Sequence, residues 1–268
     1  VPSASLNKVA IVYALASMWQ DGLIDIEREV PYIRELVLES EIKGEIVKFK
    51  QFSPDGQKSF KLRDLSRPGI AESGSTPIGL ILYAMGSNGT YKENPTKKEI
   101  GEQVKRGIQK VNYYTEKAGF FGIKVRSPYL DKKKLEAIDF GGVDHTDNVT
   151  TAEETNKFSV FIKQGGNLNP QYLELLTGPM SDEQTSKYWQ NILGGVDFGK
   201  PGVDKFNNGY TFVKGDIAGT IILKHKPANP IYGGDLAHKS ELSHVVTDYG
   251  KNILNYLAKY FTGIHNLM

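Results

Sequence analysis

The pattern of hydrophobic and polar positions predicts a chain that is mostly helical, with strands near its end. Residues 6–20 are apolar on nearly every face, which predicts a helix buried in a core. Runs of β-branched residues predict strands at 210–213 and 217–224. Apolar spacing and capping residues predict further helices, at 31–43, 95–117, from Thr150 onward, 181–193 and 243–261. Short helices are expected over 62–85 and a long surface loop over 119–142.

This order of elements predicts an α+β fold. We expect a mainly helical part over residues 1–193 and a part made of strands and a closing helix over 194–268. The chain has 268 residues, which is enough for a large core. No stretch of 18 or more apolar residues occurs, so the sequence predicts no transmembrane segment.

Charge and cysteine content exclude several classes of function. The chain has 33 basic and 31 acidic residues, so nothing in its net charge favours a nucleic-acid partner. Without cysteine there is no disulfide, thiol catalysis or cysteine-based metal site. Histidines near the end match no metal-ligand spacing, and residues 194–200 lack the Ser or Thr of a phosphate-binding loop. We therefore expect neither a metal nor a cofactor.

A serine and a lysine stand one turn apart where the first predicted helix begins. Ser5 and Lys8, at positions i and i+3, share one side of the helix. A partly desolvated lysine beside a serine can accept the hydroxyl proton and make the oxygen nucleophilic. The simpler interpretation is that Ser5 caps the helix, and the same spacing recurs at Ser40 and Lys43, where a solvated helix face explains it.

Three segments in series resemble the serine β-lactamases and penicillin-binding proteins, with a pattern most similar to class A β-lactamases. The first is the motif at 5–8 with the helix that follows it. The second runs from residue 62 to 82 and contains Ser73-Gly74-Ser75, which is similar to the Ser-x-Asn segment of the family. The third covers 147–154 and 175–181, which resemble the two helices before the last active-site strand. Agreement in order and spacing is more specific than any single motif.

The resemblance implies roles for individual residues. Ser5 would be the acylated nucleophile, Lys8 the group that takes its proton, and Ser73 the hydroxyl that passes a proton to the leaving nitrogen. Ser75 stands where the family usually has asparagine and would contact substrate through a shorter side chain. Glu136 lies at a fitting distance for the deacylating glutamate of class A enzymes. A solvated acid in a loop is the alternative for Glu136.

The family also carries a Lys-Thr-Gly motif on the strand beside the nucleophile, and this motif has no clean match in the sequence. Lys214 and Gly215 follow a predicted strand and are therefore assigned as the substrate-binding pair. The rivals are Lys200-Pro201-Gly202 and the lysine-free 207–209. An amide of this strand, together with that of Ser5, would hold the oxyanion.

The implied function is that of a serine hydrolase that forms an acyl-enzyme with a β-lactam or with a D-Ala-D-Ala-type peptide amide. The partner would be a small β-lactam or a stem peptide of bacterial peptidoglycan, and the location extracytoplasmic, either periplasmic or secreted. Only four residues precede Ser5, so we expect the two N-terminal strands of the family to belong to a missing segment or the sheet to be completed otherwise. The alternatives are a non-catalytic binding or structural module of the same fold and an unrelated helical protein.

Overall fold

The computed structural model of the chain describes residues 3, 5–39, 41, 56–141, 147–182, 196–203 and 207–224. The predicted helix at 243–261 and all but the first two residues of the one at 181–193 lie outside this part of the chain.

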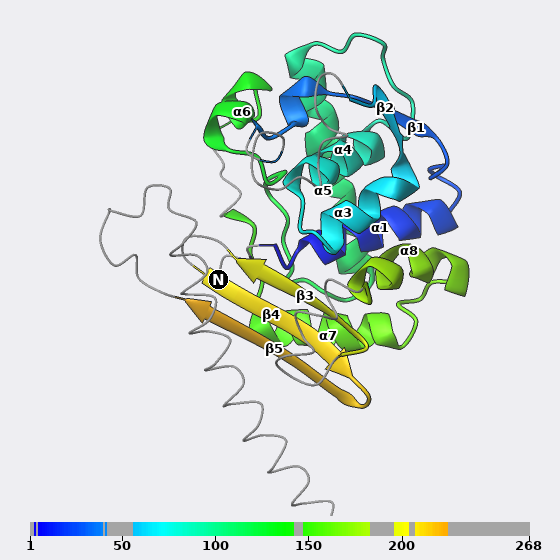
Figure 1. Ribbon diagram of the computed structural model, residues 1–268, viewed down its shortest axis with the longest axis vertical. Helices are drawn as coiled ribbons and strands as arrows, with labels where there is room; N and C mark the ends of the chain where they lie inside the picture. Colours follow the sequence, from blue (N-terminus) through cyan, green and yellow to red (C-terminus); the bar gives the residue numbers. More distant parts are fainter. Residues whose placement is uncertain are drawn as a thin grey trace, which may run out of the picture.

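A buried helix, α1 (Lys8–Gln20), lies at the centre of the helical layer. Its residues from Lys8 to Met18 are all buried, as expected for a helix that is apolar on nearly every face. Three further helices pack around it: α3 (Ser66–Ile70), α4 (Ser75–Gly86) and α5 (Lys97–Lys117). The 3-10 helix η3 (Leu62–Leu65) packs against α3 and α4. These elements form the upper half of the molecule in Figure 1.

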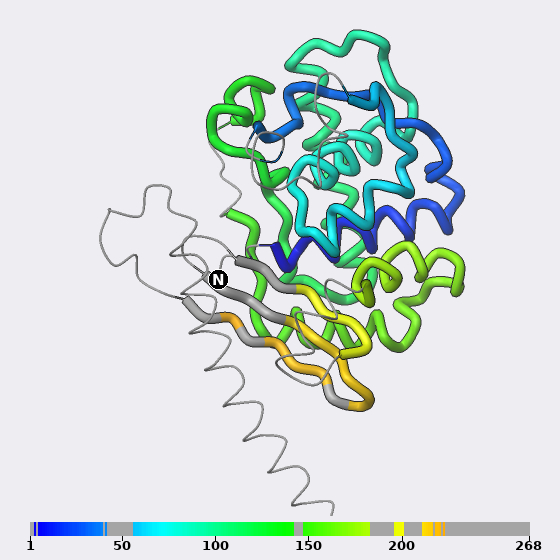
Figure 2. The backbone as a smooth tube through the Cα atoms, viewed as in Figure 1, coloured from blue at the N-terminus to red at the C-terminus, as the bar shows by residue number. Residues whose placement is uncertain are grey.

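A three-stranded antiparallel sheet forms the second layer. Its strand order is β3 (Phe198–Val203), β4 (Asn207–Lys214) and β5 (Ile217–Lys224). Helix α7 (Ala152–Lys163) packs against β4 and β5, and α8 (Pro170–Met180) contacts both α1 and β3. The trace in Figure 2 shows the start of α1, in blue, close to the edge of this sheet that β3 forms. Lys8 and Lys200 both bond to Ser73 in this region.

Several predicted elements are confirmed. Helix α5 begins at a capping box in which Thr96 accepts the amide of Glu99 and the Glu99 carboxylate accepts the amide of Thr96. Helix α7 begins at Thr151, whose hydroxyl accepts the amide of Glu154. The strands predicted at 210–213 and 217–224 lie within β4 and β5.

The helix predicted at 31–43 is wrong over residues 31–38, and residues 40, 42 and 43 lie outside the described part of the chain. The chain instead forms β1 (Glu29–Pro31), which pairs with β2 (Ser59–Lys61), and then the 3-10 helix η1 (Arg34–Leu36). Ile33, Leu36 and Val37 are all buried, so a single tight turn satisfies the apolar spacing that suggested a longer helix. The expected loop at 119–142 also contains a short helix, α6 (Lys132–Ala137).

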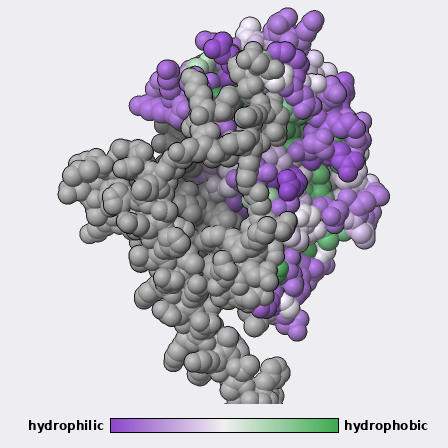
Figure 3. Space-filling model, viewed as in Figure 1, coloured by the Kyte–Doolittle hydropathy of each residue, from purple (hydrophilic) through white to green (hydrophobic). Residues whose placement is uncertain are grey.

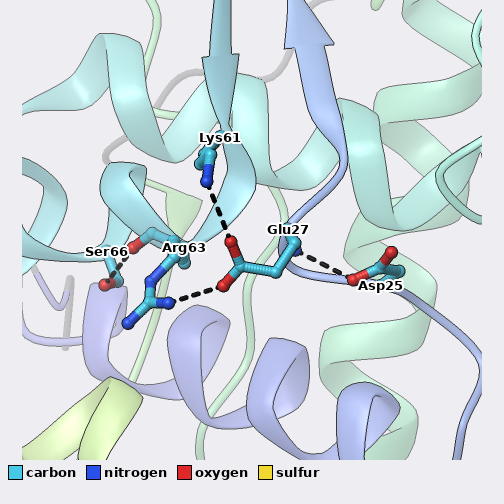
Figure 4. A network of polar contacts seen from close by, with 5 residues as sticks. All are labelled: Asp25, Glu27, Lys61, Arg63 and Ser66. Atoms are coloured by element: carbon cyan, nitrogen blue, oxygen red, sulfur yellow. Dashed lines mark hydrogen bonds and ion pairs between the residues drawn. The ribbon is translucent and has the colours of Figure 1, made fainter.

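A polar network ties the segment after α1 to the segment that leads toward Ser73. The Glu27 carboxylate bonds Lys61 at 3.1 Å and Arg63 at 2.5 Å, and the Glu27 amide donates to Asp25 (Figure 4). Hydrogen bonds from Lys61 and Arg63 lower the pKa of Glu27. The hydroxyl of Ser66, the first residue of α3, donates to the Arg63 carbonyl. Because these side chains are exposed, the network fixes geometry more than it adds stability.

The described part of the face in Figure 3 is mainly hydrophilic. The large hydrophobic side chains that are exposed within the described residues are Leu23, Tyr113 and Phe121. None of the described helices is both long enough and apolar enough to span a membrane.

Helices α4 and α5 approach each other closely through glycines. A Cβ atom at Gly107 would overlap the carbonyl oxygen of Leu82, and one at Gly86 would overlap that of Gln103. The two helices cannot easily move apart, because the apolar residues around both glycines are buried in the core. The close contact fixes the position of α4, whose first residue is Ser75.

We predict that Gly107→Ala destabilises the protein although alanine favours helices more than glycine does. The new methyl group meets backbone that cannot shift, so we expect a loss of at least about 2 kcal/mol in the free energy of unfolding, measured by denaturant titration. Gln109→Ala, on an exposed position of the same helix, should change it by less than about 0.5 kcal/mol. Equal effects of the two substitutions would contradict the close helix contact.

Candidate active site

The turn that enters α1 is anchored by Asn7, one of the two residues between the predicted nucleophile, Ser5, and the predicted base, Lys8. Asn7 is buried, and its side-chain amide donates to the carbonyls of Lys124 and Val149 at 3.1 and 3.0 Å. Ser5 is half-buried in this turn, and its carbonyl accepts the amide of Lys8 at 3.3 Å. Ser5 and Lys8 therefore lie one turn apart at a fixed start of the helix, as their spacing predicts.

The ammonium group of Lys8 is held by the loop that precedes α4. Its Nζ atom donates to the carbonyl oxygen of Ser73 at 2.5 Å and to the hydroxyl of Ser75 at 3.3 Å. Its hydrogen bonds do not include one to the Ser5 hydroxyl. The ring of Tyr129 covers Nζ, with its centroid 5.0 Å away. Lys8 is 1% exposed, and this burial lowers its pKa to about 8, an effect that the charge of Glu41 partly offsets.

Ser73 adopts a backbone conformation that non-glycine residues rarely take. Its φ angle is +58°, in the left-handed region. Two backbone hydrogen bonds hold the turn: the Ser73 amide donates to Ile70, and the Gly74 amide to Pro68. In this conformation the Ser73 carbonyl meets Lys8 while the Ser73 hydroxyl meets another lysine, Lys200. Strain of this kind is typical of residues whose orientation serves a function.

Lys200, on strand β3, completes the cluster. Its Nζ atom donates to the Ser73 hydroxyl at 2.9 Å, and the residue is 1% exposed. Burial, reinforced by the charge of Lys8, lowers the pKa of Lys200 well below its usual value. Lys200-Pro201-Gly202 thus has the Lys-x-Gly spacing that the resemblance requires, on a strand next to Ser73.

The assignment of Lys214 and Gly215 is corrected by the strand register. Lys200 pairs with Thr211, and Lys214 lies three residues further along β4, where alternation directs it to the opposite face of the sheet. Lys214 is exposed, and Gly215 belongs to the β4–β5 turn, where its amide donates to the Asp197 carboxylate. These two residues lie away from Ser73.

Glu136 is likewise not brought to the cluster. It lies on α6, its side chain is 64% exposed, and its nearest charged partner is Lys132 at 3.9 Å. The buried side of this short helix is instead occupied by Leu135. From the predicted loop at 119–142, the residue that reaches Lys8 is Tyr129.

Sequence reasoning overlooked Glu41, which fell within a predicted helix face. Its carboxylate accepts the amide of Ser75 at 2.6 Å and the amide of Thr76 at 2.9 Å, and the residue is 9% exposed. A buried acid that caps a helix more than thirty positions along the chain leaves no local pattern in the sequence, so no sequence signal pointed to it.

The described residues contain no group of three or more side chains suited to bind a metal ion. A cavity of about 520 Å³ lies between η3, α3 and α8, and its lining includes Arg63, Arg67 and Glu72. It does not include the lysine and serine cluster, although Glu72 directly precedes Ser73. The cavity is therefore separate from the candidate active site.

Comparisons with known proteins agree with this arrangement at the level of the fold. No family model and no curated protein matches the sequence. Solved structures that match include a β-lactamase from Burkholderia vietnamiensis, with a TM-score of 0.64, 12% identity and coverage of 96% of this chain and 83% of that one. The TLA-3 extended-spectrum β-lactamase matches with a TM-score of 0.64, 13% identity and coverage of 96% and 85%. The ancestral Gram-negative class A β-lactamase matches with a TM-score of 0.63, 15% identity and coverage of 95% and 85%. The chain has the α+β fold of the serine β-lactamases.

The burial of Lys8 should make the protein less stable than it could be. Between pH 8 and 10.5 the unfolded chain holds the Lys8 proton and the folded chain does not, so stability rises with pH in this range. We predict that Lys8→Met raises the free energy of unfolding at pH 7 by about 3 kcal/mol, and that this gain shrinks toward pH 10.5. Denaturant titrations at several pH values test it.

The control is Lys98→Met at an exposed position of α5, which should leave the pH dependence unchanged. A Lys8→Met variant that is less stable than the parent at pH 7 would show that Lys8 is not destabilised by its surroundings.

Proposed function

We propose that the protein is a serine acyltransferase or hydrolase in which Ser5 attacks an amide carbonyl and becomes acylated. The observation that carries this proposal is the position of Ser73 between two buried lysines, with its carbonyl on Lys8 and its hydroxyl on Lys200. Removing two lysine side chains from water costs a fold that has no use for them several kcal/mol. Such a use exists in a reaction that needs a neutral amine as base and a second lysine to bind the substrate.

The hydrogen bonds of Lys8 suit the role of a base. A neutral amine has two N–H groups and one lone pair, and the two acceptors on Lys8 are the Ser73 carbonyl and the Ser75 hydroxyl. With both N–H groups engaged, the lone pair is left for the Ser5 proton. As the Ser5 oxygen bonds to the carbonyl carbon, its proton passes to Lys8.

Ser73 and Lys200 suit the departure of the leaving group. The Ser73 hydroxyl accepts from Lys200, so its own hydrogen remains to be donated to the amide nitrogen as the C–N bond breaks. The proton that Lys8 took from Ser5 then replaces the proton that the Ser73 hydroxyl has lost. A carboxylate on the substrate would be attracted to Lys200, as in a β-lactam or in a peptide that ends in D-Ala-D-Ala.

The site favours acylation over hydrolysis of the acyl-enzyme. Glu136 faces solvent, and of the described acids only Glu41 acts on the pKa of Lys8. Both oxygens of Glu41 are already engaged by backbone amides, so it is poorly placed to activate water. We therefore propose a long-lived acyl-enzyme, of the kind that a peptidoglycan peptidase or transpeptidase forms with β-lactams. The stem peptide substrate places the proposed reaction outside the cytoplasm, in the periplasm or after secretion.

Covalent labelling with a fluorescent penicillin tests acylation. We expect the folded protein to be labelled and Ser5→Ala to lose all label, because the nucleophile is gone. The matched pair Lys200→Ala and Lys214→Ala separates the two candidate lysines: the first should lower the labelling rate at least about 100-fold and the second should leave it unchanged. Circular dichroism confirms that each variant is folded.

Two results would contradict the proposal. Label that persists in Ser5→Ala places the reactive group elsewhere. A folded protein that takes up no label with any β-lactam or D-Ala-D-Ala peptide would instead be a non-catalytic module of this fold.

The lifetime of the label tests the second part of the proposal. After excess unlabelled penicillin is added, we expect the fluorescent adduct to persist for many minutes, because no described carboxylate is free to activate water at the site. Release within seconds would contradict this and point to efficient hydrolysis. Glu136→Gln is the control, and it should leave the release rate unchanged because Glu136 faces solvent.

A further inference from the structure

The carboxylate of Glu41 holds the beginning of the helix that carries part of the site. The first helical amides of α4 are those of Ser75 and Thr76, and each donates to a different oxygen of Glu41. These amides have no partner within the helix, so the carboxylate satisfies them and also opposes the positive end of the helix dipole. The N-cap residue itself is Gly74, which has no side chain that could accept these amides.

This contact lies within two residues of both atoms that hold Lys8. The amide bound by Glu41 and the hydroxyl bound by Lys8 belong to the same residue, Ser75. The other acceptor of Lys8 is the carbonyl of Ser73, two residues earlier in the same strained turn. A shift of the start of α4 would therefore move both acceptors of the Lys8 amine together.

Glu41 also supplies negative charge near two buried lysines, Lys8 and Lys200. Within the described ranges, the groups that face Lys8 are Lys200 from β3, the ring of Tyr129, the Ser73 turn and Glu41. Among them Glu41 is the acid, and its charge favours the protonated form of Lys8. Two separate observations, the hydrogen bonds and the charge, thus connect Glu41 to the Lys8 amine.

We propose that Glu41 is a positioning residue for acylation: by binding the Ser75 and Thr76 amides it fixes the two oxygens that orient the Lys8 amine toward Ser5. The inference rests on the proposed function. It assigns a role to a residue that touches neither the substrate nor the reacting atoms.

Two substitutions separate the geometry of Glu41 from its charge. Glu41→Gln keeps the shape but removes the charge and one acceptor, whereas Glu41→Asp keeps the charge but is too short to hold both amides. We expect both to lower the maximal acylation rate at least about tenfold, because the Lys8 amine is no longer aligned. Acylation requires neutral Lys8, so its rate falls on the acid side of the pH profile. That acid limb should move to lower pH by about half a unit or more in Glu41→Gln only.

The control is Thr96→Ala, which removes the N-terminal cap of another helix, α5, away from the site. It should lower the melting temperature and leave the pH profile of acylation unchanged. If both Glu41 variants acylate with the rate and profile of the parent, or lose only stability as Thr96→Ala does, Glu41 is a structural cap and the proposal fails.

A measurement without substrate keeps this result apart from a failure of the proposed function. In protein with ¹³C-labelled lysine, the Lys8 signal is identified by its loss in Lys8→Ala and is then titrated by NMR. We expect its midpoint near pH 8 in the parent and lower in Glu41→Gln. A parent that never acylates but shows this difference would refute the proposed function and retain the connection between Glu41 and Lys8. An unchanged midpoint in Glu41→Gln would refute that connection whether or not acylation occurs.

Discussion

The desolvation of Lys8 is the constraint on which the rest of the site depends. A lysine at the start of a fully buried helix loses most of its hydration, and its pKa falls to about 8. This shift corresponds to about 3 kcal/mol of lost stability at neutral pH. The fold keeps this loss from being larger through the hydrogen bonds that Lys8 donates to Ser73 and Ser75 and through the charge of Glu41. It offsets the remainder through the apolar core around α1.

The surrounding elements act as supports for this one amine. Asn7 fixes the turn that enters α1 by binding two carbonyls of the Lys124–Val149 bridge. The glycine contact between α4 and α5 fixes the helix that begins at Ser75. Strand β3 brings Lys200 to the other side of Ser73. Because β3 is an edge strand, it tolerates Pro201 in the middle of the Lys-x-Gly motif.

The sequence was sufficient for the parts of the structure that depend on local patterns. The buried helix α1, the caps at Thr96 and Thr151 and the strands β4 and β5 follow from periodicity and capping chemistry. The resemblance to the serine β-lactamases predicted the fold and identified Lys8, Ser73 and Ser75 as candidate site residues. It failed at Lys200, because a strand with two glycines and a proline has little strand propensity and is stabilised by pairing with β4. Glu41 required the tertiary structure, since its partners are 34 and 35 positions away.

The central claim is that Ser5 is the nucleophile of a site built around a neutral Lys8. Mass spectrometry of the whole protein after exposure to a penicillin, followed by peptide mapping, tests it most directly. We expect one adduct with the mass of the intact penicillin, located on Ser5 in the peptide that contains the start of α1. An adduct on Lys8 or Lys200, or none on the folded protein, would contradict the claim.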